Sequence, residues 1–216
     1  MGPTRTVVSC HLVTDLIQQL LDTGAYTNLV VCGTRSEFLV QLSAAIHSQE
    51  PIPKAPSRHD LLTKTIGLLA QSSKIRLTFC PSLESLRAHL ATQSSDHDAI
   101  GETKGGSRLS LLAILDAVAL HGTTMEFAAQ GLSRTFAAAV ETASRANVDL
   151  LLCECDNAMN PSSADWGGRL WDTQVPLLNG SLRIRSEEGN WGGRGVSIKQ
   201  VAQRWFMFQA DQETAC

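Results

Sequence analysis

The sequence lacks several features that mark common classes of protein. No apolar run approaches the ~18 residues of a transmembrane helix, so we expect no membrane partner. No secretory signal peptide precedes the first predicted element. The net charge of −3 argues against a protein covered by nucleic acid, although a local basic cluster is compatible with it.

The six cysteines also lack the paired spacing of a metal site; they stand at positions 10, 32, 80, 153, 155 and 216. Cys153 and Cys155 would share one face of a strand, but no further Cys or His joins them, so core packing is preferred over a metal site. Buried thiols with no signal peptide suit a reducing cytosol or nucleus. We expect no bound metal and no cofactor.

A complete nucleotide-binding loop is missing as well. The stretch NLVVCGTRSEFLVQL (28–42) has the order strand, tight turn, helix. A working phosphate loop needs a glycine-rich turn that ends in Lys followed by Ser or Thr. Here Gly33 and Thr34 lead into Arg35, Ser36 and Glu37, which places a carboxylate where a phosphate would bind. The turn is therefore predicted to shape the sheet without binding phosphate.

The rest of the sequence alternates between helical and strand periodicity. Helical spacing of apolar residues predicts helices at 12–22, 36–47, about 61–69, 83–90 and 131–148. Strands are predicted at 28–32, 74–80, 109–121 and 148–155. The runs at 109–121 and 148–155 are continuously apolar, which is typical of parallel strands buried on both faces. Strands alternating with helices indicate a mostly parallel sheet.

The last third of the sequence has a different pattern. The segments GSLRIRS (180–186), GVSIKQVA (195–202) and RWFMFQ (204–209) alternate over short lengths and are joined by turn-rich stretches. This pattern predicts an antiparallel β meander at the edge of the sheet. The predicted fold is therefore α/β: a mostly parallel central sheet flanked by helices, with a C-terminal antiparallel meander, in one domain over residues 1–216.

The order of these parts resembles the core of the RecA-like recombinases. The matching parts are the strand, turn and helix at 28–47, LLAILDAVALH, the helix at 131–148, the strand DLLLCECDN (149–157) and the end QRWFMFQ. In this resemblance Asp116 matches the Walker B acid, although hydrogen bonding to a neighbouring loop would equally explain it. The catalytic glutamate is missing, since strand 74–80 ends at Cys80-Pro81. The resemblance thus implies a degenerate nucleotide site formed by Gly33, Thr34, Arg35, Ser36 and Asp116.

Among RecA-like proteins, a non-catalytic chain of this size is similar to the recombinase paralogues of the Shu complex. That similarity implies a nuclear pseudo-ATPase that pairs with another RecA-like paralogue. It also implies binding to single-stranded or branched DNA, and assistance to the recombinase filament in homologous recombination repair. A second setting stays open, the RecA-like subcomplex of Elongator, which acts on transfer RNA, because fold alone does not decide between binding functions.

The resemblance aligns residues 156–174 with the second DNA-binding loop of the recombinases. Trp166 and Trp171 could stack on bases while Arg169 contacts phosphate, although Trp171 could equally belong to the core. Further cations follow on the predicted meander, and they are Arg183, Arg185, Arg194 and Lys199. Charges on an edge hairpin are also common without any ligand.

An enzyme of another class remains as an alternative. An open α/β sheet binds ligands beyond the carboxyl ends of its strands. Gly33, Asp116 and Glu154 or Asp156 could meet there, with His121 as a base. Ordinary solvation of loops explains the same polar residues.

Overall fold

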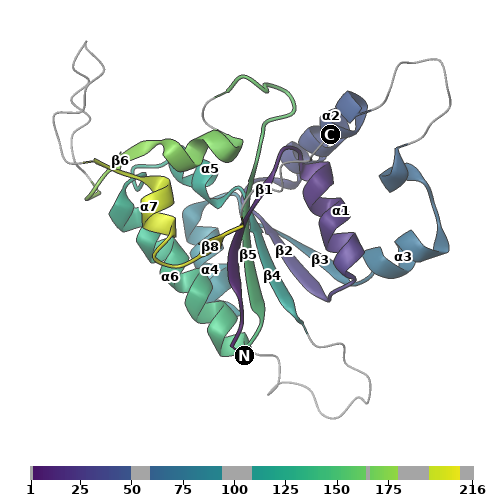
Figure 1. The fold of residues 1–216 in the computed structure, drawn as a ribbon, viewed down its shortest axis with the longest axis horizontal. Helices are drawn as coiled ribbons and strands as arrows, with labels where there is room; N and C mark the ends of the chain where they lie inside the picture. Colours follow the sequence, from purple (N-terminus) through teal and green to yellow (C-terminus); the bar gives the residue numbers. More distant parts are fainter. Residues whose placement is uncertain (1, 50–58, 94–108, 164–165, 180–194, 210–216) are drawn as a thin grey trace.

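A six-stranded parallel sheet forms the centre of the protein (Figure 1). The computed structural model describes residues 2–49, 59–93, 109–163, 166–179 and 195–209. The sheet order is β3-β2-β4-β5-β1-β8, and every neighbouring pair is parallel. Its strands are β1 (Arg5–Cys10), β2 (Thr27–Val31), β3 (Ile75–Phe79), β4 (Leu111–Leu115), β5 (Asp149–Cys155) and β8 (Met207–Phe208). The predicted α/β class with a mostly parallel sheet is confirmed.

Helices cover both faces of this sheet (Figure 1). One face carries α1 (Val13–Thr23), α2 (Arg35–Gln49) and α3 (Ile66–Ser72), with the short 3-10 helix η1 (Asp60–Leu62) before α3. The other face carries α4 (Leu83–Thr92), α5 (Ala117–Gly122), α6 (Ala129–Ala146) and α7 (Ile198–Ala202). Among the described residues no helix is long and apolar enough to cross a lipid bilayer.

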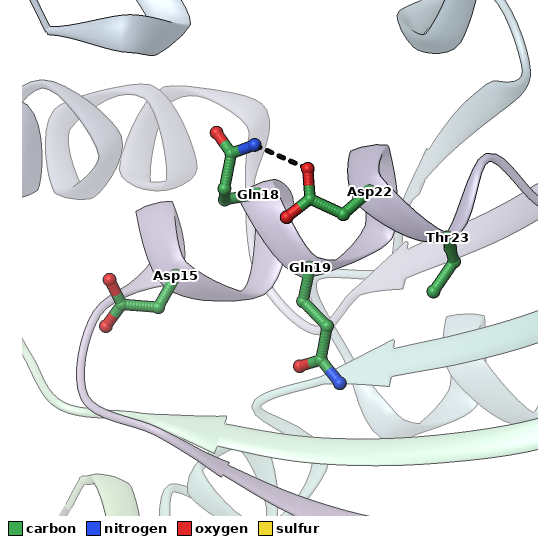
Figure 2. A pocket seen from close by; sticks show the side chains of 5 residues that line it. All are labelled: Asp15, Gln18, Gln19, Asp22 and Thr23. Carbon is green, nitrogen blue, oxygen red and sulfur yellow. Dashed lines mark hydrogen bonds between the residues drawn. The ribbon is translucent and has the colours of Figure 1, made fainter. Parts of the chain in front are cut away.

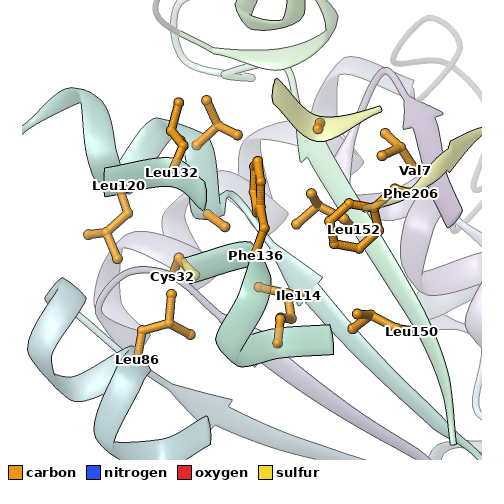
Figure 3. Packing of buried hydrophobic residues seen from close by; sticks show 14 of the residues in the cluster. Val7, Cys32, Leu86, Ile114, Leu120, Leu132, Phe136, Leu150, Leu152 and Phe206 are labelled. Carbon is orange, nitrogen blue, oxygen red and sulfur yellow. The ribbon is translucent and has the colours of Figure 1, made fainter. Parts of the chain in front are cut away.

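The continuous apolar strands are explained by an apolar core on each side of the sheet. On β4, Ile114 belongs to the core under α4–α7, while its neighbour Leu115 belongs to the core under α1 and α2. Figure 3 shows the first of these cores, with Phe136 of α6 lying over the sheet beside Phe206. The two rings meet edge to face with centroids 5.5 Å apart. Burial on both faces removes the polar positions that would produce alternation.

The segments that follow the strands leave the carboxyl edge of the sheet, some toward one face and some toward the other. β1 and β2 lead into α1 and α2 on one face, whereas β3, β4 and β5 lead to elements on the other. β1 lies next to β5, and β2 lies next to β4. Adjacent strands whose connections diverge in this way leave a crevice at their carboxyl ends, where open α/β sheets bind ligands. These two positions are the natural places to look for a site.

Two segments that were predicted as single strands each contain a strand followed by a helix. Residues 109–121 are not one strand, because β4 ends at Leu115 and α5 begins at Ala117. Residues 195–202 form the short strand β7 (Gly195–Ser197) followed by α7, and not a single strand. Ser197 accepts the N–H of Gln200 and the Gln200 side chain accepts the N–H of Ser197, a capping box that starts the helix.

Within the described residues, the predicted meander is represented by a small antiparallel sheet. β6 (Gln174–Pro176) pairs antiparallel with β7, so an antiparallel element near the C-terminus is confirmed. The segment 204–209 instead contributes β8 to the parallel sheet, beside β1. The segment 180–186 lies outside the described residues. Strand β1 was not predicted, because only Val7 and Val8 are buried along it and they give no clear periodicity.

Candidate functional site

The turn between β2 and α2 is closed by its own side chains. Only Cys32, Gly33 and Thr34 separate the two elements. The Thr34 N–H and hydroxyl donate to Glu37 Oε2 at 2.9 and 2.8 Å, and the Glu37 N–H donates to Thr34 Oγ1 at 3.2 Å. This is a capping box. The Thr34 N–H lowers the pKa of Glu37, so the group held at this helix start is the protein's own carboxylate.

The remaining predicted residues of the degenerate nucleotide site show no phosphate-binding geometry. Arg35 and Ser36 are the first residues of α2 and are exposed. A side chain at Gly33 would meet only Glu37 Oε2, at 3.6 Å, so the position has room for more than glycine. No neighbouring atom therefore comes so close to Gly33 that only glycine would fit there.

Asp116 lies at the corner between β4 and α5 and turns toward β5. Its backbone is left-handed, with φ 61° and ψ 34°, a conformation that aspartate and asparagine adopt more readily than other residues with a side chain. Its Oδ1 accepts the N–H of Cys155 at 3.0 Å, and its own N–H donates to the Cys153 carbonyl at 2.9 Å. Asp116 is partly buried, and desolvation of its carboxyl group raises the pKa of Asp116 to about 7.

Glu154, on β5, is a second acid at the same corner. It is buried, with 1% of its surface exposed, and its carboxylate accepts the N–H groups of Val118 at 2.7 Å and Ala119 at 3.1 Å. Burial, reinforced by the charge of Asp116, raises the pKa of Glu154. The structure thus brings Asp116 and Glu154 together, and both are engaged with backbone groups.

The 156–174 loop starts at the carboxyl ends of the neighbouring strands β1 and β5. His11 Nδ1 lies 3.4 Å from Asp156 Oδ2, at the exposed edge. Gly167 has φ +71°, and a Cβ there would overlap Asp156 Oδ1, so this position requires glycine. From α2, Gln41 donates to Asn157 Oδ1 at 2.8 Å and accepts the Ala158 N–H at 2.9 Å. The loop is therefore anchored to α2 at one end and folded back on Asp156 at the other.

His11 and Gln41 were not singled out from the sequence. Each lies more than a hundred residues from its partner in the loop, and each is an ordinary polar residue within its own segment. Only the sheet order, which puts β1 beside β5, could have indicated His11.

His121 is not available as a base for a bound substrate. It has no exposed surface, Nε2 lies 2.9 Å from Thr135 Oγ1, and Nδ1 lies 3.2 Å from the Glu126 carbonyl. Burial lowers the pKa of His121 to about 4. Nearby, Arg87 forms a two-pronged ion pair with Glu126, at 3.0 and 2.7 Å. His121 therefore belongs to a network that joins α5, α4 and α6.

The predicted stacking residues of the loop have different environments. Trp171 lies in the 3-10 helix η2 (Gly167–Asp172) and is only 5% exposed. Its ring packs edge to face on Phe208 with centroids 5.2 Å apart, so a base has no open face to stack on. Trp171 is a core residue, and the stacking role is corrected for it. Trp166 is partly buried against the same core.

Two of the predicted cations are exposed close to η2. Arg169 projects from η2, and its Nη1 lies 3.5 Å from the Ser162 carbonyl. Lys199 of α7 is exposed, with Nζ 5.5 Å from the centroid of the Phe208 ring on which Trp171 packs. Since α7 and η2 are in contact, both cations lie on one packed unit. The other predicted cations, Arg183, Arg185 and Arg194, lie outside the described residues.

A hollow along α1 has the wrong charge for a phosphate ligand (Figure 2). It measures about 600 Å³ and is lined by Asp15, Gln18, Gln19, Asp22 and Thr23. Its charged side chains are both acids, and Asp22 already accepts the Gln18 side-chain amide at 2.8 Å. It contains no residue predicted to bind a ligand.

No metal centre is evident in the part of the chain that the structure describes: no three His, Cys, Asp or Glu side chains there are grouped to hold an ion. A protein-family model described as SPAC22G7.03-like matches residues 5–208. A search of curated proteins gave no match. The family description specifies no activity, so a function has to be argued from the geometry above.

Proposed function

We propose that this chain, which belongs to the SPAC22G7.03-like family, is a non-catalytic RecA-like subunit that binds DNA and assists a recombinase filament. In this proposal it is a nuclear protein and acts as one half of a heterodimer with another RecA-like paralogue. The observation that supports it best is the closed turn at Thr34. There Thr34 donates to the Glu37 carboxylate of a capping box, which supports the view that this helix start holds the protein's own acid and no phosphate.

Three features of that turn and its surroundings support the proposal that the chain does not hydrolyse ATP. Anions bind at the start of a helix because unpaired N–H groups point outward there. The Glu37 carboxylate already accepts the Thr34 N–H, and its negative charge repels phosphate. The chain also offers no Lys at the turn, and Asp116 hydrogen bonds to the β5 backbone. We therefore expect neither tight binding nor turnover of ATP.

The nucleic-acid surface in this proposal is the packed unit formed by η2 and α7. Arg169 and Lys199 supply exposed positive charge there, and Trp166 is the aromatic residue that stays partly accessible. Because the whole protein is acidic, long-range attraction is weak and a local cluster has to hold the ligand. With few cations available we expect modest affinity and a shallow salt slope, on the order of two to four neutralised phosphates.

The heterodimer is proposed from the family resemblance and is compatible with exposed apolar side chains. Met125, between α5 and α6, is 88% exposed, and Leu177, after β6, is 48% exposed. The Leu177 carbonyl accepts the N–H of Gln130 at the start of α6, so both lie near that end of the helix. A partner chain would bury such residues. Light scattering of the protein with and without a co-expressed RecA-like paralogue tests this step.

The DNA-binding step is tested by fluorescence anisotropy with a labelled single-stranded oligonucleotide over a salt series. Arg169→Ala and Lys199→Ala should each weaken binding several-fold for all sequences alike, because phosphate contacts carry no base information. Lys64→Ala is the matched control, since Lys64 is exposed before α3, on the opposite face. Unchanged affinity in both the Arg169→Ala and Lys199→Ala variants would refute the proposed surface. Tighter binding of transfer RNA than of DNA would favour the Elongator-type alternative.

A calorimetric titration with ATP and Mg²⁺ tests the nucleotide site separately. We expect no measurable heat and no turnover above that of Asp116→Ala. Micromolar binding, or hydrolysis lost in that variant, would show an active nucleotide site and overturn the pseudo-ATPase proposal.

A further inference from the structure

Strand β3 forms one edge of the central sheet, and in the described part of the chain it pairs with β2 alone. The Lys74 carbonyl and the Cys80 N–H, just outside the two ends of β3, both bond to β2. Residues two apart along a strand point their backbone groups to the same side. Ile75, Leu77 and Phe79 therefore direct their N–H and C=O groups outward, away from the sheet.

The side chains at this edge are apolar on one face of the sheet. Leu77 pairs with Leu29, whose side chain belongs to the core under α1 and α2, so Leu77 points to that face as well. Ile75 and Phe79 pack against the same core, whereas Leu77 between them is 47% exposed. Native edge strands are commonly protected by Pro, Lys or a bulge, and the sequence IRLTF of β3 has neither Pro nor Lys.

Helix α3 adds apolar side chains beside this edge. It precedes β3 directly and contacts α1, on the face to which Leu77 points (Figure 1). Ile66 and Leu69, one turn apart, are 87% and 60% exposed, and none of the seven residues of α3 is buried. Apolar side chains that gather at a surface in this way mark a site of contact with another molecule.

The pattern of β3 is complementary to itself. A two-fold axis at Leu77 would pair two copies of the strand antiparallel, with Leu77 opposite Leu77 and Ile75 opposite Phe79 of the second copy. The outward backbone groups of both strands would then face one another as hydrogen-bonded pairs. On the other face Arg76 would lie opposite Thr78, so that no like charges oppose each other.

The opposite edge of the sheet offers much less backbone for pairing. β8 has two residues, whereas β3 has five. A head-to-tail contact of β3 with β8 would form few bonds and would continue from chain to chain, whereas a contact of β3 with β3 closes after two chains.

We propose that two copies of this chain join through their β3 edges into one continuous sheet. In the joined sheet the start of each β3 lies beside the end of the other, so α3 of each copy reaches the partner's strand and buries Ile66 and Leu69. This interface includes neither Met125 nor Leu177, which were assigned to the paralogue, and it does not depend on the proposed DNA-binding function.

Sedimentation equilibrium of the full-length protein tests the dimer. Between about 1 and 100 μM, the mass should rise from 23.3 kDa toward twice that value. Leu77→Lys should weaken the dimer about tenfold or more, because it places two positive charges opposite each other at the axis. Leu177→Lys is the matched control, since Leu177 is 48% exposed, and its dimer should stay within about twofold of the wild type. Circular dichroism verifies that both variants are folded.

Cross-linking tests the register and does not depend on the lysine variant. Residues opposite each other in a hydrogen-bonded antiparallel pair have Cα atoms about 5.5 Å apart, which a disulfide spans. Leu77→Cys should therefore give a covalent dimer on mild oxidation, visible on a non-reducing gel. Arg76→Cys should not, because its two copies would be offset by two residues, beyond the roughly 7 Å limit of a disulfide. The wild type controls for the native cysteines.

Four results would overturn the proposal. A wild type that stays monomeric up to about 100 μM is the first. The second is a dimer that Leu177→Lys weakens as much as Leu77→Lys does, and the third is cross-linking of Arg76→Cys as fast as that of Leu77→Cys. The fourth is a complex that forms only with a co-expressed paralogue and is lost in Leu77→Lys, since it would assign this edge to another protein.

Discussion

Replacing Trp171 by Ala separates a core role from a DNA-binding role at this position. The side chain is 5% exposed and packs on Phe208, which itself belongs to β8 at the edge of the sheet. Truncation of a buried Trp costs roughly 3–5 kcal/mol, and the edge-to-face contact accounts for about 0.5–1.5 kcal/mol of that. This is a large part of the roughly 5–15 kcal/mol that stabilises a typical domain.

The free energy of unfolding is measured by urea denaturation followed by far-UV circular dichroism, so that loss of the fluorophore does not matter. Trp171→Phe is the graded variant and should cost about a third to a half as much, because a smaller ring still meets Phe208. Under conditions where the Ala variant is folded, its DNA affinity should stay within about twofold of the wild type. A cost below about 1 kcal/mol, together with weaker binding to single strands, would refute the core assignment.

Three further predictions concern the network around α6. Gly131→Ala should destabilise the protein by roughly 2–4 kcal/mol in thermal or urea unfolding, because its Cβ would overlap the Glu126 carbonyl, whereas Gly122→Ala, which meets nothing within 4 Å, should cost far less. Arg87→Met should lower the free energy of unfolding by about 1–3 kcal/mol, since it leaves Glu126 and Thr135 without their shared donor. A change near zero would show that the ion pair does not stabilise the fold. The pKa of His121 is about 4 in the folded protein and about 6.5 in the unfolded chain, so the unfolded chain binds the proton first as the pH falls. The free energy of unfolding should therefore decrease by roughly 3 kcal/mol between pH 6.5 and pH 4 on account of this group. In the His121→Gln variant, denaturation measured over the same pH range should lack this decrease.

Much of the central sheet was predictable because its signals are local. The apolar runs of β4 and β5 and the apolar stripe on α6 each occur within a single segment. Burial on both faces makes the two strands continuously apolar, which identifies them in the sequence. The end of β4 was missed because Asp116 interrupts an apolar run that continues into α5. α7 was missed because five helical residues show no period, although the capping box at Ser197 was visible.

The candidate site was less predictable because its decisive contacts are long-range. The role of Trp171 depends on Phe208, and that of Glu154 on the N–H groups of Val118 and Ala119. The Glu37 carboxylate was expected to exclude phosphate, and its bonds to Thr34 agree with that local interpretation. Contacts within one turn follow from spacing along the chain, whereas contacts between strands require the sheet order.

The position of β1 between β5 and β8 has a consequence for synthesis of the chain. β1 pairs with β5 across about 145 residues and is the neighbour to which β8 pairs. A growing chain therefore emerges with its first strand long before the sheet partners of that strand exist. β1 lacks a sheet partner until β5 has been made, whereas the apolar face of α1 can already pack on β2 and α2. Such delayed closure slows folding and exposes the early segment to aggregation, so the nascent chain is expected to depend on protection by chaperones.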